Sequence, residues 1–176
     1  MEQLLLETIF QDHKIIGWDM DETLINGPYS KRFREYINNH PEKKHCIITF
    51  RERKDAHNIW NELLECDEIP LLKTQFSSLS WMPDYIRYHK EEWPEDIKNI
   101  TYDDILSQTH LECLNKHDFS HDDFNYAWTM LRDWKAFECR EISATILVDD
   151  LVNLTQDGCK KYNIDFLNSI TLEKNL

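Results

Sequence analysis

Glycine is scarce in this chain, with only 3 glycines in 176 residues. The glycine-rich loops that cradle nucleotide phosphates, of the dinucleotide-binding or the Walker type, need glycines at fixed spacing because their backbone turns tightly against the ligand. Neither pattern occurs in the sequence. The sequence therefore argues against nucleotide binding through such a loop.

Cysteine is present, but without the spacing of a structural site. The five cysteines are an odd number, lie far apart and form no C-x-x-C pair. His110, His117 and His121 lie fairly close in sequence, yet their spacing does not match a zinc motif. A disulfide framework and a zinc site both have little support. Buried free thiols in a reducing compartment are the expected state of the cysteines.

Long apolar runs and a secretory leader are also missing. The first residues, MEQLLLETIFQDHK, contain no basic region followed by a long apolar stretch, so they do not read as a signal peptide. No apolar run approaches the roughly 20 residues that a membrane-spanning helix needs. The sequence predicts a cytoplasmic protein with no membrane partner.

Basic residues are outnumbered, because 20 Lys and Arg face 33 Asp and Glu, which gives a net charge of −13. Such a surface repels a phosphodiester backbone, so nucleic acid is a disfavoured partner. Apolar residues make up 41% of the chain and aromatic residues 12%, which is enough for a folded core. The length suits one domain, 1–176, and leaves the oligomeric state open.

Three short apolar runs end abruptly in polar residues. They are residues 15–18, followed by Asp19; residues 46–48, followed by Thr49; and residues 145–148, followed by Asp149 and Asp150. Because the runs are short, continuous and rich in β-branched residues, they predict buried strands of a parallel sheet. A final strand is expected near Ile164 and Phe166.

Helical spacing of apolar residues lies between these runs, at 29–39, 53–65 and 122–142. Alternating strands and helices predict βαβ units and a layered α/β domain. Residues 66–120 are expected to hold a modest, mostly helical insertion and one further strand, at 76–81 or alternatively at 69–72. The aromatic residues of this region could form the core of a small cap or line a substrate pocket.

The polar residues at the strand ends are expected to meet. In an open parallel sheet, groups that follow the carboxyl ends of neighbouring strands face one crevice. Asp19, Asp21, Asp149 and Asp150 would crowd together there, beside Thr49. Such a group of carboxylates needs a positive partner, and Mg²⁺ is the natural candidate because it is a hard cation that prefers carboxylate oxygens and can orient a phosphate.

These residue types suggest roles in phosphoryl transfer. Asp19, the first residue after its strand, is the best-placed nucleophile. Asp21 could protonate the leaving oxygen and then deprotonate the attacking water. Thr49 could bind phosphate oxygens at a strand-to-helix turn. A lysine is needed to stabilise the charge, and Lys135 is the first candidate, with Lys116 as the alternative.

The same positions resemble the motifs of a known family. DMDETL, 19–24, resembles the D-x-D-x-T signature of the haloacid dehalogenase-like (HAD) hydrolase superfamily. IITFR, 47–51, looks like its second motif in a T-x-R form. Lys135 is similar in placement to the third-motif lysine, and LVDD, 147–150, resembles the paired-acid fourth motif. The likeness runs from about 14 to 166, with the motifs in family order.

The resemblance implies a Rossmann-like parallel sheet flanked by helices. It implies Mg²⁺ held by Asp19, by the backbone carbonyl of Asp21 and by Asp149, with Asp150 assisting. An aspartate nucleophile with Asp21 retained indicates a phosphatase, because the dehalogenase members lack the second aspartate. An insertion after the second motif would act as a lid that selects the substrate.

The residues of the second motif are the predicted substrate contacts: Thr49, Phe50 and Arg51. For Arg51, an ion pair within the protein is the alternative. The sequence predicts a Mg²⁺-dependent phosphatase that acts on a small phosphorylated metabolite or nucleotide. A polynucleotide end phosphatase is one alternative, and a catalytically idle domain that binds phosphate or a partner is another.

Overall fold

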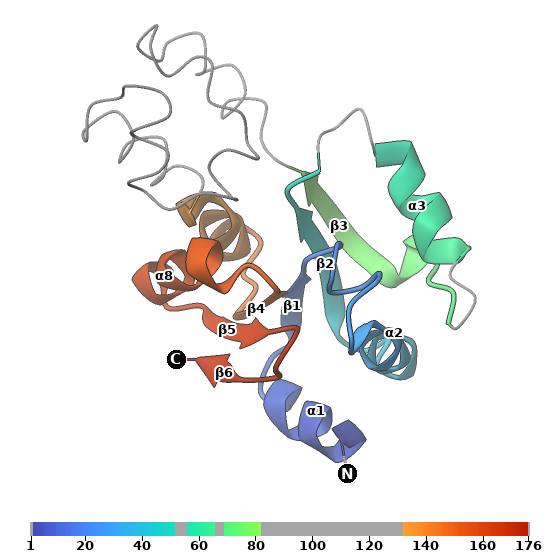
Figure 1. Cartoon of the computed structure of the whole chain (residues 1–176), viewed down its shortest axis with the longest axis horizontal. Coiled ribbons are helices and arrows are strands. Elements are labelled where there is room, and N and C mark those ends of the chain that lie inside the picture. The colour runs from blue at the N-terminus through green and yellow to red at the C-terminus, as the bar shows by residue number, and fades with distance from the viewer. Residues whose placement is uncertain (1, 52–55, 66–68, 82–131, 176) are drawn as a thin grey trace, which may run out of the picture.

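The computed structural model describes residues 2–51, 56–65, 69–81 and 132–175. Within them a six-stranded sheet runs in the order β3-β2-β1-β4-β5-β6 (Figure 1). The strands are β1 Ile15–Trp18, β2 Lys44–Thr49, β3 Phe76–Trp81, β4 Ile146–Asp149, β5 Asp165–Asn168 and β6 Lys174–Asn175. The first five are parallel, and β6 pairs antiparallel to β5. The predicted α/β class with a parallel sheet is confirmed.

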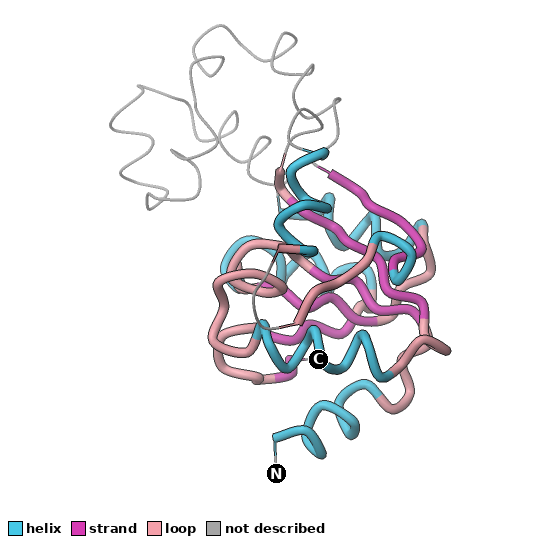
Figure 2. The backbone as a smooth tube through the Cα atoms, turned by 90° about the vertical axis from the view of Figure 1, so that its right-hand side faces the viewer, coloured by secondary structure: helices cyan, strands magenta, loops and turns pink. Residues whose placement is uncertain are grey.

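Helices cover both faces of this sheet, as Figure 2 shows from the side. They are α1 Glu2–Phe10, α2 Ser30–Asn39, α3 Ala56–Leu64, a helical segment at 132–141 and α8 Val152–Tyr162, with a short 3-10 helix, η2, at Lys73–Gln75. The predicted helix at 29–39 is confirmed, as are the described parts of those at 53–65 and 122–142. Sequence analysis did not predict α1, α8 or the edge strand β6.

The strand predictions agree closely with the observed strands. The bounds predicted for the first strand equal those of β1. The observed β2 is longer than the predicted 46–48, and β4 begins and ends one residue later than the predicted 145–148. Of the two candidates for a further strand, 76–81 is correct, because β3 pairs with β2 in parallel. Residues 69–72 form no strand. Most of the predicted insertion at 66–120 lies outside the described residues, so its helical character stays a prediction.

The sheet divides the core into two apolar layers. One layer joins α1, α2 and α3 to the sheet face that carries Ile16, Trp18 and Val148. The other joins the 132–141 helix and α8 to the face that carries Ile48, Leu147 and Phe166. Because apolar side chains leave both faces of the inner strands, those strands read as continuous hydrophobic runs.

A polar chain inside the first layer ties β1 to β2. The indole Nε1 of Trp18 donates to Nδ1 of His45 at 3.1 Å, and Nε2 of His45 donates to the carbonyl of His40 at 3.0 Å. Burial is the main cause that lowers the pKa of His45 below its usual value. The imidazole is therefore neutral at physiological pH, which suits a ring that accepts at one nitrogen and donates at the other.

A buried arginine anchors the loop that leads from β1 to α2. Arg34, fully buried in α2, donates through Nε to the carbonyl of Leu24 at 2.5 Å. Its Nη1 donates to the carbonyls of Leu63 and Ile69 at 3.1 and 2.8 Å. One guanidinium thus connects this loop to the end of α3 and to the segment that follows it, which limits the conformations open to the loop.

Among the described helices, none has the length and apolarity that crossing a membrane requires.

Gly158 of α8 lets this helix approach the 132–141 helix closely. A Cβ at Gly158 would lie 2.5 Å from the carbonyl oxygen of Arg132 and 3.1 Å from Cα of Asp133. Glycine to alanine inside a helix normally stabilises by about 1 kcal/mol. Here the clash is with backbone, so we expect Gly158→Ala to lower the free energy of unfolding by about 1–3 kcal/mol.

Urea denaturation measures this effect. Asn153→Ala, at an exposed position of the same helix, is the matched control and should leave the stability nearly unchanged. A Gly158→Ala protein as stable as the wild type would contradict the close packing of the two helices.

A candidate metal and acidic site at the carboxyl edge of the sheet

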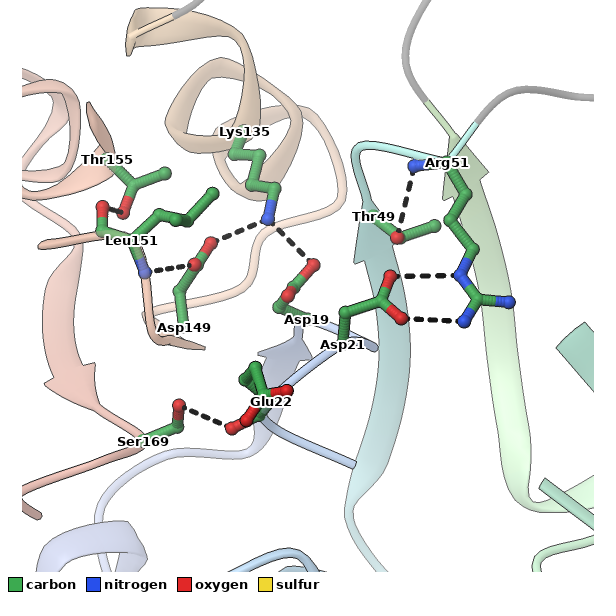
Figure 3. Close-up of polar contacts among 10 residues, drawn as sticks. All are labelled: Asp19, Asp21, Glu22, Thr49, Arg51, Lys135, Asp149, Leu151, Thr155 and Ser169. Atoms are coloured by element: carbon green, nitrogen blue, oxygen red, sulfur yellow. Dashed lines mark hydrogen bonds and ion pairs between the residues drawn. The ribbon is translucent and has the colours of Figure 1, made fainter. Parts of the chain in front are cut away.

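Side chains from three strands and one helix meet at the carboxyl edge of the sheet (Figure 3). Asp19 follows β1, Thr49 ends β2 and Asp149 ends β4. The backbone N–H of Asp19 donates to the carbonyl of Val148 at 2.8 Å, so the β1–β4 pairing continues up to the site. The sequence pattern thus predicted correctly which strand ends come together.

Lys135 enters this edge from the 132–141 helix and is fully buried. Its Nζ donates to Oδ1 of Asp19 at 2.7 Å and to Oδ2 of Asp149 at 2.6 Å. Asp149 is fully buried and Asp19 nearly so. The lysine therefore bridges the ends of two neighbouring strands, as Figure 3 shows. Lys116, the alternative lysine, lies outside the described residues.

Three carboxylates gather beside this lysine. One oxygen from each of Asp19, Asp149 and Asp150 lies within 4.8 Å of the others, and these residues could hold a metal ion. Oδ1 of Asp149 accepts from the backbone N–H of Leu151 at 2.9 Å, and Oδ2 accepts from Lys135, so both oxygens of this carboxylate are fixed. A site made only of carboxylate oxygens fits a hard divalent cation.

The carboxyl groups of this site outnumber its single ammonium group by three to one. Burial raises the pKa of Asp19 to about 8; the Lys135 ammonium opposes this shift, and the charge of Asp149 adds to it. Burial and then Asp149 raise the pKa of Asp150 to about 6. The pKa of Lys135 also rises, because the two carboxylates it contacts outweigh its burial. One ammonium does not neutralise three carboxylates, whereas a divalent cation would favour their ionised forms.

Phe50 lies against the lysine. Nζ of Lys135 sits 4.2 Å from the centroid of the Phe50 ring, and that ring packs edge-on against Trp134 at 5.4 Å. An aromatic face attracts a cation, most strongly when the pair is shielded from water. Sequence analysis missed this contact, because nothing in the motif shows that the residue after Thr49 turns towards the lysine. The predicted substrate contact of Phe50 stays a prediction.

Thr49 and Arg51 lie on the other side of Asp19. The Thr49 hydroxyl accepts from the backbone N–H of Arg51 at 3.2 Å, and the threonine is buried. The guanidinium of Arg51 makes ion pairs with Asp21 and Glu62. The alternative weighed for Arg51, an ion pair within the protein, is thus what the structure contains. Glu62 carried no signal in the sequence beyond its place in a predicted helix.

The turn after β1 directs Asp21 away from the acidic group. Its carboxylate faces Arg51, while Asp19 faces Lys135 (Figure 3). Glu22 has a positive φ of 52°, and its carbonyl accepts from the hydroxyl of Ser169 at 3.1 Å. Ser169 was not predicted from the sequence. The turn thereby separates the two aspartates into a buried and an exposed position.

The comparisons with known proteins add no relative to this picture. No family model matches the chain, and no curated protein matches its sequence. The structure itself establishes a Rossmann-like α/β sheet with an acidic group at its carboxyl edge.

Replacement of Lys135 tests the charge balance. Lys135→Met leaves buried carboxylates without their cation, so we expect the free energy of unfolding in metal-free buffer to fall by about 3–5 kcal/mol. Lys160→Met is the matched control, because Lys160 is an exposed lysine of α8, and exposed charges contribute little to stability. Equal effects of the two substitutions in chemical denaturation would contradict the bridging role.

A divalent cation should stabilise the protein through the acidic group. A ligand that binds only the folded state raises the free energy of unfolding by about 2.7 kcal/mol when its concentration is 100 times its Kd. We expect the unfolding midpoint to rise with added Mg²⁺ or Mn²⁺ and to return with EDTA. Asp149→Asn should abolish the rise, whereas Asp157→Asn, at an exposed position of α8, should preserve it. A rise that survives Asp149→Asn would place the cation elsewhere.

Proposed function

We propose that this chain is a Mg²⁺-dependent phosphatase of the HAD type, which hydrolyses a small phosphorylated metabolite or nucleotide through an aspartyl-phosphate. The observation that carries the proposal is the position of Asp19. Its carboxylate accepts one hydrogen bond from Lys135, and one of its oxygens lies within 4.8 Å of an oxygen of Asp149 and of Asp150, at the edge of a parallel sheet where ligands bind.

The proposed metal site uses the carboxylates of Asp19, Asp149 and Asp150. Mg²⁺ bound there would neutralise the carboxylates and offset the charge of a substrate phosphate. Lys135 supplies a further positive charge at a fixed place, because its Nζ is already bonded to Asp19 and Asp149. Such preorganised charge stabilises a transition state without any rearrangement at the moment of reaction.

The proposed chemistry has two steps. In the first, an oxygen of Asp19 attacks phosphorus, the bond to the leaving oxygen breaks, and that oxygen takes a proton from Asp21. In the second, water attacks the phosphorus of the aspartyl-phosphate, gives its proton to Asp21 and releases inorganic phosphate and free Asp19. In this proposal the Thr49 hydroxyl, on the neighbouring strand, would contact a phosphate oxygen.

The separation of the two aspartates supports these roles. The Asp19 side chain is only 6% exposed, which suits a nucleophile that must be kept from bulk water, and the Asp21 side chain is 51% exposed. A leaving group and a water molecule can therefore both reach Asp21. The acidic surface argues against a polynucleotide substrate.

Turnover with p-nitrophenyl phosphate and a panel of phosphorylated metabolites and nucleotides tests the proposal. We expect hydrolysis that requires Mg²⁺ and that falls by more than about 10³-fold in Asp19→Asn. Acid-quenched protein should carry one labile phosphoryl group in the wild type and none in the variant. Asp157→Asn serves as the control and should keep full activity.

Two results would contradict this function. Activity that survives Asp19→Asn would show that Asp19 is not the nucleophile. A folded, metal-binding wild type that turns over no member of the panel would favour the alternative of a domain that binds phosphate or a partner without catalysis.

A further inference from the structure

The guanidinium of Arg51 lies between two carboxylates that belong to different parts of the fold. Its Nε and Nη2 donate to the two oxygens of Asp21 at 2.9 and 2.6 Å. Its Nη1 and Nη2 donate to the two oxygens of Glu62, on α3, at 2.8 Å each. Both ion pairs are therefore bidentate, and Figure 3 shows the half that involves Asp21.

This arrangement uses most of the hydrogen-bonding capacity of Arg51. A guanidinium has five N–H donors, and four of them point to these two carboxylates. An arginine that clamps a phosphate uses the same two-pronged geometry. Arg51 could clamp a substrate phosphate only by releasing Asp21 or Glu62, so the contacts favour a different role.

We propose that Arg51 and Glu62 are positioning residues that fix the carboxylate of Asp21, and that Arg51 is not the phosphate clamp. The inference rests on the proposed function, in which Asp21 gives a proton to the leaving group. It competes with the sequence-based prediction that Arg51 binds the substrate. The catalytic residue remains Asp21, and the other two act through it.

Burial shows why Asp21 needs such support. Its side chain is 51% exposed and stands on a turn, whereas the Arg51 side chain is only 19% exposed. An exposed aspartate without partners exchanges between rotamers, which costs entropy when the reaction demands one of them. Two hydrogen bonds to the largely buried guanidinium hold both carboxylate oxygens in a single orientation, and each oxygen keeps a second lone pair that can carry the transferred proton.

Arg51 can hold Asp21 because it is itself fixed at both ends. Its backbone N–H donates to the Thr49 hydroxyl at 3.2 Å, directly after β2. Its far end is held by Glu62, whose backbone belongs to α3 and whose neighbours Ile59 and Leu63 are fully buried. The orientation of Asp21 is thus set by the packing of α3 on the sheet.

Leaving-group dependence distinguishes positioning from other roles. An alkoxide needs a proton to leave, whereas p-nitrophenolate departs as a stable anion. The ratio kcat/KM reports the steps up to that departure, so it isolates the first proton transfer. We expect Glu62→Gln to lower kcat/KM for a simple alkyl phosphate roughly tenfold, a part of what a general acid supplies. The loss with p-nitrophenyl phosphate should stay below about twofold.

Glu65→Gln is the matched control, because it removes the same charge from an exposed residue directly after α3. It should leave both substrates unaffected. Equal losses of kcat/KM with both substrates in Glu62→Gln would overturn the proposal, as would equal effects of the two glutamate substitutions.

Phosphate affinity separates positioning from clamping. We expect calorimetric binding of inorganic phosphate, with Mg²⁺ present, to change by less than about twofold in Glu62→Gln and in Arg51→Lys. Lysine keeps the charge but cannot form the bidentate pairs. If Arg51 clamps the phosphate, the affinity should fall about tenfold or more in Arg51→Lys, and this result would overturn the proposal.

A denaturation cycle decides the question even without turnover. Asp21→Asn and Glu62→Gln, singly and together, should shift the unfolding midpoint non-additively, because both carboxylates share one guanidinium. Additive shifts of the unfolding midpoint would overturn the proposal that Glu62 acts on Asp21 through Arg51. A wild type that hydrolyses no member of the phosphate panel but shows non-additive shifts would contradict the proposed function while supporting the inferred coupling.

Discussion

The contact on which the rest of the site depends is the buried ion pair of Lys135 with Asp19 and Asp149. A buried charge is costly, and only close, well-directed partners offset that cost. The three residues come from a helix and two adjacent strands, so the helix must approach the sheet closely and in one orientation. Gly158 allows this, because the 132–141 helix lies directly against the backbone of α8 at that point. The apolar layer around Trp134 and Cys159 then holds both helices on the sheet.

The opposite layer controls the turn that carries the two aspartates. Arg34 connects this turn to the end of α3, and the Trp18–His45 pair joins β1 to β2 just below it. Both contacts are buried, so the turn is held by groups that water does not reach. Asp19 and Asp21, only two residues apart, consequently face different surroundings. Asp19 faces a closed group of charges, and Asp21 faces an open, half-exposed network with Arg51.

Sequence reasoning succeeded where a rule of periodicity applied. Continuous apolar runs identified β1, β2 and β4, and the polar residues at their ends identified the site, because parallel strands bring their carboxyl ends to one edge. Reasoning from the sequence was weaker for the helices. Neither α1 nor α8 was predicted: α1 leaves Leu4 and Leu5 exposed and so breaks the amphipathic pattern, and α8 is a polar helix that begins two residues after the fourth motif. The edge strand β6 spans only two residues and lacks any pattern.

The parallel α/β architecture and the acidic residues at the strand ends could be inferred from the amino-acid sequence, since both follow from the order of residues along single elements. The sequence also offered Lys135 as a positively charged partner, with Lys116 as the alternative, but which groups each acid contacts depends on the tertiary structure. Lys135 reaches Asp19 across 116 positions of the chain, and Arg51 reaches Asp21 across 30. Phe50 and Glu62 joined the site only through the way their elements pack. Such contacts depend on how helices rest on the sheet, and the packing of whole layers, rather than any local pattern, sets that geometry.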